Sequence, residues 1–157
     1  MRNRGTLGGS LAHADPAADW VSAMAVLDAG IVVTGPAGER TIPASQFVLG
    51  IMSTAMGADE VLVGVRVPKL SPRARWSYWK FCRKTGEFAE AIGAFVVDPE
   101  RNWWRGVMGA TEGAPVVIDD ARSLDPAAVA AEAYEPGTYE HQIHAAALKR
   151  AADRLSQ

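Results

Sequence analysis

Three consecutive segments of the sequence have the residues of neighbouring antiparallel strands. Residues 89–98 (AEAIGAFVVD) are almost continuously apolar and end in the turn sequence DPERN, after which residues 103–111 (WWRGVMGAT) are again aromatic and apolar. Residues 76–82 (WSYWKFC) come before them and have the same character. A tight turn between two such segments joins antiparallel strands, because parallel strands need a long crossover. The sequence therefore predicts an antiparallel meander.

The N-terminal part of the chain predicts a helix and then a hairpin. Residues 16–29 (PAADWVSAMAVLDA) follow Asp15, a residue typical of an N-cap, and Pro16 suits the first helical turn. Residues 31–43 place β-branched residues on both sides of a turn made of glycine and proline, which indicates a hairpin. Residues 44–57 are expected to form a short helix and a loop.

A further strand is predicted over residues 60–68 (EVLVGVRVP), which ends at a proline. Its valines alternate along the segment, as on a half-buried strand whose inward side chains are Val61, Val63, Val65 and Val67. Residues 69–75 (KLSPRAR) have the composition of a linker.

The last third of the chain predicts one short strand, at residues 115–119, and two alanine-rich helices, at residues 125–134 and 138–155. With the meander, these elements give an α+β fold in two pieces. We expect the first piece to span residues 1–70 and the second, a small antiparallel sheet packed with helices, to span residues 71–157.

The composition argues against several classes of function. The 157 residues carry 16 basic and 18 acidic side chains without a long run of either sign, which disfavours nucleic-acid binding. Cys82 is the only cysteine, so this chain has no internal disulfide and no cysteine-ligated metal or iron–sulfur cluster. No apolar run approaches the ~20 residues of a membrane helix, and the N-terminus is unlike a signal peptide. We expect a cytoplasmic protein with neither a transmembrane segment nor a nucleic-acid partner.

The segment TLGGS near the N-terminus has residues that suit an anion. Gly8 and Gly9 allow backbone angles closed to other residues, so that successive N–H groups converge on one point, and Thr6 and Ser10 add hydroxyl donors. Such a nest would hold a pyrophosphate, but a pair of glycines between polar residues is also typical of an ordinary turn. Asp19 likewise has two interpretations: it accepts hydrogen bonds from a ribose or an amide, or it only stabilises the first turn of a helix.

The other candidate residues, a lysine, several aromatic residues and the histidines, are mostly expected to have structural roles. Lys80 shares one face of its predicted strand with Trp76 and Tyr78, and the aromatic residues of that strand are expected in the core or at an interface. The three histidines lack the spacing and acidic neighbours of a metal site, and His141 and His144 are expected on the surface of a helix or in packing.

Residues 4–19 (RGTLGGSLAHADPAAD) closely resemble the second phosphate-binding segment of the FAD-binding subunit of molybdenum hydroxylases, the carbon monoxide dehydrogenase and xanthine dehydrogenase family. Later segments are similar to that family in the same order, so the resemblance covers nearly the whole chain. These segments are TIPASQFVLG, EVLVGVRVP, WSYWKFCRKTGEFAEAIGAFVV and AYEPGTYEHQIHAAALKRA. The resemblance implies the second subdomain of a PCMH-type FAD-binding domain, followed by a domain like the C-terminal domain of the carbon monoxide dehydrogenase flavoprotein.

The resemblance also implies a set of cofactor contacts. The FAD pyrophosphate would be held by Thr6, Leu7, Gly8, Gly9 and Ser10. Asp19 matches an acidic contact of the cofactor, Leu62 an apolar contact near the flavin, and Lys80 a basic residue near the ring. A cation there would stabilise the reduced, anionic ring and raise its potential, whereas most strand lysines simply face solvent. No residue is expected to act as an acid, base or nucleophile.

In this family, FAD passes electrons to a terminal acceptor from two [2Fe-2S] clusters in a small subunit, and the substrate is oxidised at a molybdopterin centre in a large subunit. The family also has an N-terminal subdomain with its own glycine-rich loop, which is expected to be lacking here. Three interpretations are open: a truncated copy, a chain completed by a separate subunit, or a shortened non-catalytic module for assembly. Exposed apolar surface would then favour a partner chain or a homo-oligomer.

Overall fold

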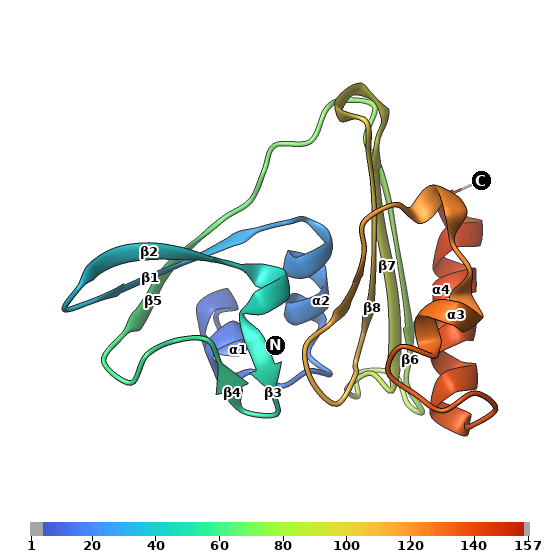
Figure 1. The fold of residues 1–157 in the computed structure, drawn as a ribbon, viewed down its shortest axis with the longest axis horizontal. Helices are drawn as coiled ribbons and strands as arrows, with labels where there is room; N and C mark the ends of the chain where they lie inside the picture. Colours follow the sequence, from blue (N-terminus) through green and yellow to red (C-terminus); the bar gives the residue numbers. More distant parts are fainter. Residues whose placement is uncertain (1–4, 156–157) are drawn as a thin grey trace.

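Two antiparallel sheets lie apart from each other in the computed structural model of the chain (Figure 1). It describes residues 5–155, so Arg4 of the phosphate-binding segment lies outside the described residues. The first sheet has the order β2-β1-β5, formed by β1 (Gly30–Gly35), β2 (Gly38–Pro43) and β5 (Val61–Arg66). The second has the order β6-β7-β8-β9, formed by β6 (Arg75–Phe81), β7 (Ala91–Asp98), β8 (Trp103–Gly109) and β9 (Val116–Ile118).

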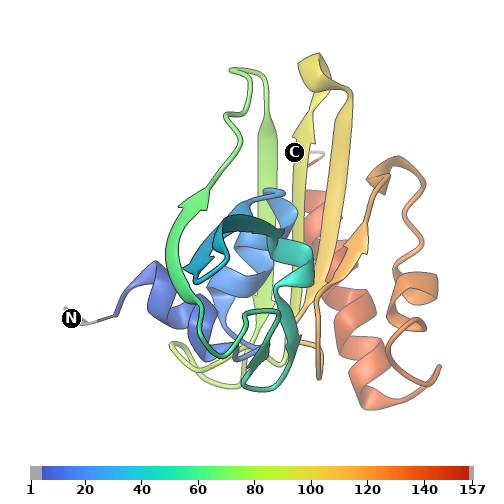
Figure 2. The ribbon, with the colours of Figure 1, turned by 60° about the vertical axis from the view of Figure 1, so that its left-hand side comes forward.

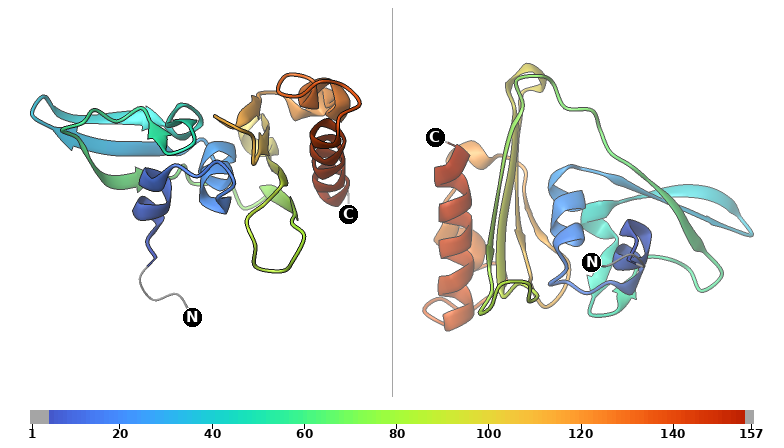
Figure 3. Two further views of the ribbon diagram at one scale, coloured as in Figure 1. Left: turned by 90° about the horizontal axis from the view of Figure 1, so that it is seen from below. Right: turned by 180° about the vertical axis from the view of Figure 1, so that it is seen from behind.

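The helices lie between and beside these sheets. They are α1 (Leu7–His13), α2 (Asp19–Val26), α3 (Pro126–Ala130) and α4 (Tyr139–Leu155). In two opposite views, α2 lies between the two sheets and α4 covers the far face of the second sheet (Figures 1 and 3). A small hairpin of β3 (Val48–Gly50) and β4 (Ser53–Thr54) lies between β2 and β5 in the chain.

Helix α2 contributes side chains to two separate parts of the core. Val21 and Met24 pack with Ile31 of the first sheet, whereas Val26 packs with Ile92 of the second. All eight residues of β7 are buried, because α2 and α4 cover its two faces. A strand covered on both faces has a continuous apolar sequence, which explains why residues 89–98 lack alternation.

The predicted meander, hairpin and α+β class are confirmed. The second sheet has the chain order β6-β7-β8-β9, and Asn102 ends the DPERN turn at a φ of 50°. Residues 67–74 form the extended connection from the first sheet to the second (Figure 2). Helix α4 begins and ends within one residue of the predicted range. No helix within residues 5–155 is long and apolar enough to span a membrane.

The predicted helix at residues 16–29 is wrong at its start. Helix α2 begins at Asp19, and Ala18 is its N-cap. Asp15 instead stabilises a turn, because its Oδ1 accepts a hydrogen bond from the N–H of Ala17 at 2.9 Å. Pro16 lies in that turn, where its fixed φ is equally well accommodated. Asp19 is therefore the first helical residue rather than a residue one turn inside.

The predicted orientation of the strand at residues 60–68 is wrong for most of its valines. Val61 is 62% exposed and Val63 53% exposed, whereas Leu62 packs against the core. The pairing of β5 with β1 shifts between Val32 and Val33, so one residue of β5 is extra. Such a bulge changes which face the later side chains occupy, and Val65 consequently contacts the core.

Two shorter segments also differ from expectation. Residues 44–57 contain a single 3-10 turn, at Ala44–Gln46, and then the β3–β4 hairpin rather than a loop. Helix α3 ends at Ala130, well before the predicted end at residue 134. Asp125 caps it by accepting hydrogen bonds from the N–H groups of Ala127 and Ala128.

Arg105 joins α2 to the second sheet. Its side chain is 11% exposed, its Nε donates to the carbonyl oxygen of Ala25 at 3.1 Å, and its remaining nitrogens pair with Asp28 and Asp119.

We expect Arg105→Leu to lower the free energy of unfolding by about 2 kcal/mol, because a charge-assisted hydrogen bond at the end of α2 is lost. Thermal unfolding followed by circular dichroism measures this effect. Lys149→Met, which removes only an exposed pair with Asp153, should change stability by less than about 0.5 kcal/mol.

Candidate functional site

The segment TLGGS forms the N-terminus of α1. Thr6 is the N-cap, and its Oγ1 accepts a hydrogen bond from the N–H of Gly9 at 2.9 Å. The N–H of Ser10 donates to the carbonyl oxygen of Thr6 at 3.0 Å. Neither Gly8 nor Gly9 has a positive φ, so the predicted nest of left-handed backbone angles is wrong. The backbone N–H groups of these glycines instead point along the axis of α1, as in any helix.

Space, rather than backbone angle, favours glycine at these two positions. A Cβ on Gly8 would lie 3.2 Å from Cδ2 of Leu62, and a Cβ on Gly9 would lie 2.9 Å from Oγ1 of Thr6. The first distance places Leu62 of β5 directly against the first turn of α1. The structure thus brings together residues that are far apart in the sequence, and the two glycines let that turn approach another group closely.

The first turn of α1 suits a negatively charged group. The N–H groups of Leu7 and Gly8 have no acceptor within the helix, because the first amides of any helix lack one. Thr6 and Gly9 are exposed, and the two glycines add no side chain that would cover these donors. Amide donors and the positive end of the helix dipole are the groups that bind phosphates in proteins. The residues present therefore fit a pyrophosphate.

Asp19, Tyr78 and Lys80 form a second cluster, between the start of α2 and β6. Oδ2 of Asp19 lies 3.0 Å from Nζ of Lys80, and Oδ1 accepts a hydrogen bond from the hydroxyl of Tyr78 at 2.7 Å. Asp19 and Lys80, both predicted as cofactor contacts, therefore contact each other. Their side chains are 54% and 24% exposed, so the pair faces solvent.

Tyr78 was not among the predicted site residues. Burial, and then the hydrogen bond to Asp19 and its charge, raise the pKa of the Tyr78 hydroxyl well above its ordinary value. The hydroxyl therefore stays protonated and donates to Asp19 at any physiological pH. The signal that could have found it is its position two residues before Lys80, which places both side chains on one face of the strand.

Leu62 lies with the first turn of α1, whereas Lys80 lies with Asp19. Within residues 5–155 no hydrogen bond or ion pair links these two clusters. The chain connects them directly, because α1 leads through the Asp15 turn into Asp19 at the start of α2.

The other aromatic residues of β6 and the buried histidine of α4 lie outside the two clusters. Trp76 is 71% exposed and lies outside the core, so that of its two expected places only the interface stays a prediction, whereas Trp79 and Phe81 face α4. The buried ring of His144 stacks on Tyr134 at 4.6 Å and contacts two carbonyl oxygens, which is the expected packing role. No group of metal ligands was found among residues 5–155.

Residues 1–70 match the family model described as the FAD binding domain in molybdopterin dehydrogenase. The carbon monoxide dehydrogenase medium chain of Hydrogenophaga pseudoflava is 41% identical over 102 residues, which are 65% of this chain and 36% of that one. The nicotine 6-hydroxylase medium subunit of Paenarthrobacter nicotinovorans is 39% identical, covering 62% of this chain and 34% of the relative. The carbon monoxide dehydrogenase medium chain of Afipia carboxidovorans is 29% identical, covering 98% and 61%.

Solved structures agree over nearly the whole chain. A chain of the carbon monoxide dehydrogenase from Hydrogenophaga pseudoflava superposes with a TM-score of 0.84 at 29% identity, covering 99% of this chain and 62% of that one. A chain of quinoline 2-oxidoreductase from Pseudomonas putida 86 gives a TM-score of 0.78 at 28% identity, covering 99% and 61%. This chain thus spans less than two thirds of the length of these relatives. In sequence and in fold it is similar to the FAD-binding medium subunits of molybdenum hydroxylases.

Proposed function

We propose that this chain binds FAD and takes part in electron transfer within a multi-subunit oxidoreductase. The observation that supports this most is the uncovered N-terminus of α1, where two glycines leave amide donors accessible and Leu62 lies directly beside them. A dinucleotide needs both a phosphate-binding turn and an apolar surface close to it. The match of residues 1–70 to an FAD-binding domain agrees with this arrangement.

In this proposal the residues predicted from the sequence keep their roles. The pyrophosphate is held by Thr6, Leu7, Gly8, Gly9 and Ser10, and Leu62 supplies an apolar contact. Asp19 accepts hydrogen bonds from the cofactor, and Lys80 places a positive charge near its ring. Tyr78 orients Asp19 through their 2.7 Å hydrogen bond. When bound, FAD supplies the redox chemistry, and these side chains bind and orient it.

The partners follow from the same proposal. Electrons reach the flavin from a small subunit with [2Fe-2S] clusters, and the substrate reacts in a large subunit that binds molybdopterin. A separate chain that supplies the first FAD subdomain, and a homo-oligomer, are further candidate assemblies. The single cysteine supports a cytoplasmic location. We assign residues 1–70 to FAD binding and residues 71–157 to the C-terminal domain of this family.

A titration of the purified chain with FAD tests the proposal. Bound flavin has an absorbance spectrum that differs from that of the free cofactor, so a saturating change gives the Kd. Thermal shifts with FAD, FMN, NAD and nucleotides then identify the preferred ligand, because a ligand stabilises the state that it binds. If micromolar FAD is not retained, even with the partner subunits present, the proposal is wrong for this chain.

Lys80→Met is expected to lower the midpoint potential of bound FAD. The substitution keeps the length of the side chain but removes a positive charge that favours the reduced, anionic ring. The shift should be modest, because the carboxylate of Asp19 lies 3.0 Å from that charge and offsets part of its field. Spectroelectrochemical titration measures the potential. An unchanged potential in Lys80→Met, equal to that of the distant Lys149→Met variant, would place Lys80 outside the flavin site.

A second candidate function is an assembly module that docks on partner subunits without FAD. It is favoured by large apolar side chains on the surface of the first piece, which are more than half exposed. They are Leu49, Ile51, Met52, Val61 and Val63. Large apolar side chains that are exposed in one part of a chain can serve as a protein–protein contact. Complex formation that is unaffected by FAD, together with no flavin retention, would favour this candidate.

A further inference from the structure

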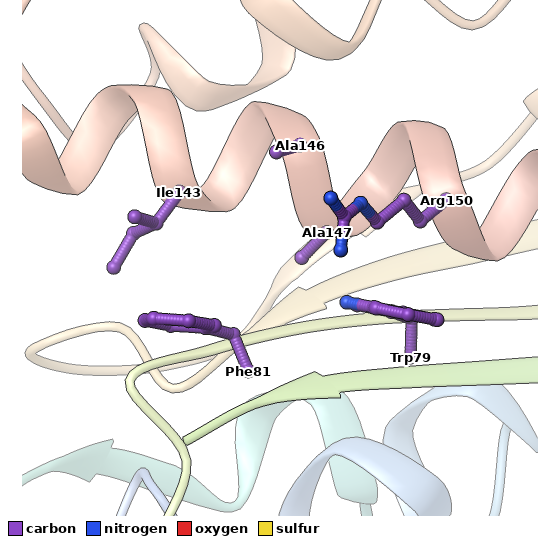
Figure 4. Close-up of a pocket in the computed structure, with 6 residues that line it drawn as sticks. All are labelled: Trp79, Phe81, Ile143, Ala146, Ala147 and Arg150. Carbon is purple, nitrogen blue, oxygen red and sulfur yellow. The ribbon is translucent and has the colours of Figure 1, made fainter. Parts of the chain in front are cut away.

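A cleft lies between β6 and α4, on the face of the second sheet that is turned away from α2 (Figure 4). It has a volume of about 150 Å³. We call it the Trp79 cleft, and its lining residues are Trp79, Phe81, Ile143, Ala146, Ala147 and Arg150. None of them belongs to the site proposed for FAD, which uses the opposite face of β6.

The cleft has an apolar end. Phe81 on β6 and Ile143 on α4 point toward one another across it, as Figure 4 shows. The alanines of α4 leave space beside these two larger side chains, and all four residues offer only carbon atoms to a bound group. This end therefore suits one large apolar side chain.

The other end of the cleft is basic. The guanidinium of Arg150 lies over the ring of Trp79, with Cζ 4.9 Å from the centroid, and that of Arg154 lies 4.4 Å from the same centroid. A contact with an aromatic ring engages one side of a guanidinium and leaves the N–H groups that point away from the ring available. Within residues 5–155 Arg150 has no hydrogen-bond partner and no carboxylate within 4.0 Å. A positioned guanidinium with unused donors suits a carboxylate bound through two hydrogen bonds.

The volume of the cleft limits the size of the group that it can hold. Sites for small molecules have volumes of about 300–1,000 Å³, so this cleft holds a single side chain rather than a whole cofactor. Strand addition at the neighbouring edge of β6 is obstructed, because Nη1 of Arg154 already donates to the carbonyl oxygen of Tyr78 at 3.1 Å. The fitting ligand is a protein segment that binds through its side chains.

We propose that the Trp79 cleft docks a segment of a partner protein in which an Asp or Glu stands next to a large apolar residue. The apolar side chain fills the space between Phe81 and Ile143, and the carboxylate pairs with Arg150. This interaction is independent of FAD binding.

Photo-crosslinking of the full-length chain tests the proposal. Ala146 is exposed at the cleft and is replaced by p-benzoylphenylalanine, and the chain is irradiated in cells that contain its complex. Mass spectrometry of the cross-linked peptide should identify a segment with an acidic and a large apolar residue within a few positions of each other. A synthetic copy of that segment is then titrated into the purified chain.

Arg150→Met should weaken binding of the synthetic segment by about tenfold or more, because it keeps the stem over Trp79 but removes the charged donors. Lys149→Met changes the same charge on the neighbouring residue and should leave the Kd unaltered. Exchanging the acidic residue of the segment for its amide should have no further effect in Arg150→Met. Removing residues 156 and 157 should not change the affinity for the segment. The carboxylate that pairs with Arg150 in this proposal belongs to the partner segment and not to the C-terminus of this chain.

Three outcomes would overturn the proposal. One is the absence of any cross-link to another protein from position 146. Another is a cross-link to a second copy of this chain, which would make the cleft a self-association surface. The third is a captured segment that has no acidic residue, or that binds Arg150→Met as tightly as it binds the wild type.

Discussion

Gly8→Asp is expected to abolish the retention of FAD by the folded chain, raising its Kd by at least about 100-fold. A Cβ at this position lies 3.2 Å from Cδ2 of Leu62, so the new side chain is directed into the contact between α1 and β5. Its carboxylate also meets the pyrophosphate proposed at the same turn. Two unit charges 4 Å apart near a protein surface repel by about 4 kcal/mol, which exceeds a 100-fold loss of affinity. Absorbance titration with FAD measures the change.

Gly64→Asp is the matched control for this prediction. It introduces the same residue on β5, where an added Cβ has no atom within 4 Å, and it lies outside the proposed site. It should bind FAD as the wild type does. Circular dichroism must show that both variants are folded before their affinities are compared. A folded Gly8→Asp variant that retains FAD normally would remove the N-terminus of α1 from the cofactor site.

The second sheet could be predicted from the sequence because its signals are local. The strands are indicated by apolar segments, and their antiparallel order by the DPERN turn that joins two of them. Neither signal depends on residues that are distant in the sequence. The two glycines at positions 8 and 9 are different, since glycine allows both a nest and the first turn of a helix. In the structure these glycines lie in the first turn of α1, where Thr6 caps the helix and Leu62 contacts Gly8. Leu62 comes from a distant part of the chain, so the local sequence cannot indicate this contact.

Tertiary pairing also explains why parts of the site could not be predicted. The register shift beside Val33 adds one residue to β5, so that Leu62 before it and Val65 after it both contact the core. Alternation along one strand cannot indicate a bulge set by its neighbour. The pairing of Lys80 with Asp19 depends on how α2 packs against the second sheet, since this packing brings the start of the helix to β6. The sequence predicts Asp19 and Lys80 as separate cofactor contacts. Their contact with each other, and the hydrogen bond from the hydroxyl of Tyr78 to Asp19, could be recognised only in the folded structure.

Gly93→Ala is expected to destabilise the chain by about 3 kcal/mol, near the upper end of what overpacking costs. Gly93 lies in the buried strand β7, where an added Cβ would lie 2.5 Å from the carbonyl oxygen of Ala147 and 2.9 Å from Cα of Leu148. These are backbone atoms of α4, so no side-chain rotation relieves the contact and the whole helix must move away from the sheet. The melting temperature should fall by roughly 6–12 °C for a chain of this size.

Gly64→Ala separates this steric effect from the general consequence of replacing a strand glycine. At Gly64 nothing lies within 4 Å of the added Cβ, and the backbone does not have the positive φ that would strain an alanine. This variant should therefore be neutral, or more stable by up to about 1 kcal/mol because the unfolded chain loses conformational freedom. Equal melting temperatures for the two variants would mean that α4 does not pack against β7 at Gly93. Since the Trp79 cleft lies between β6 and the same helix, Gly93→Ala should also weaken the binding of a captured segment, whereas Gly64→Ala should not.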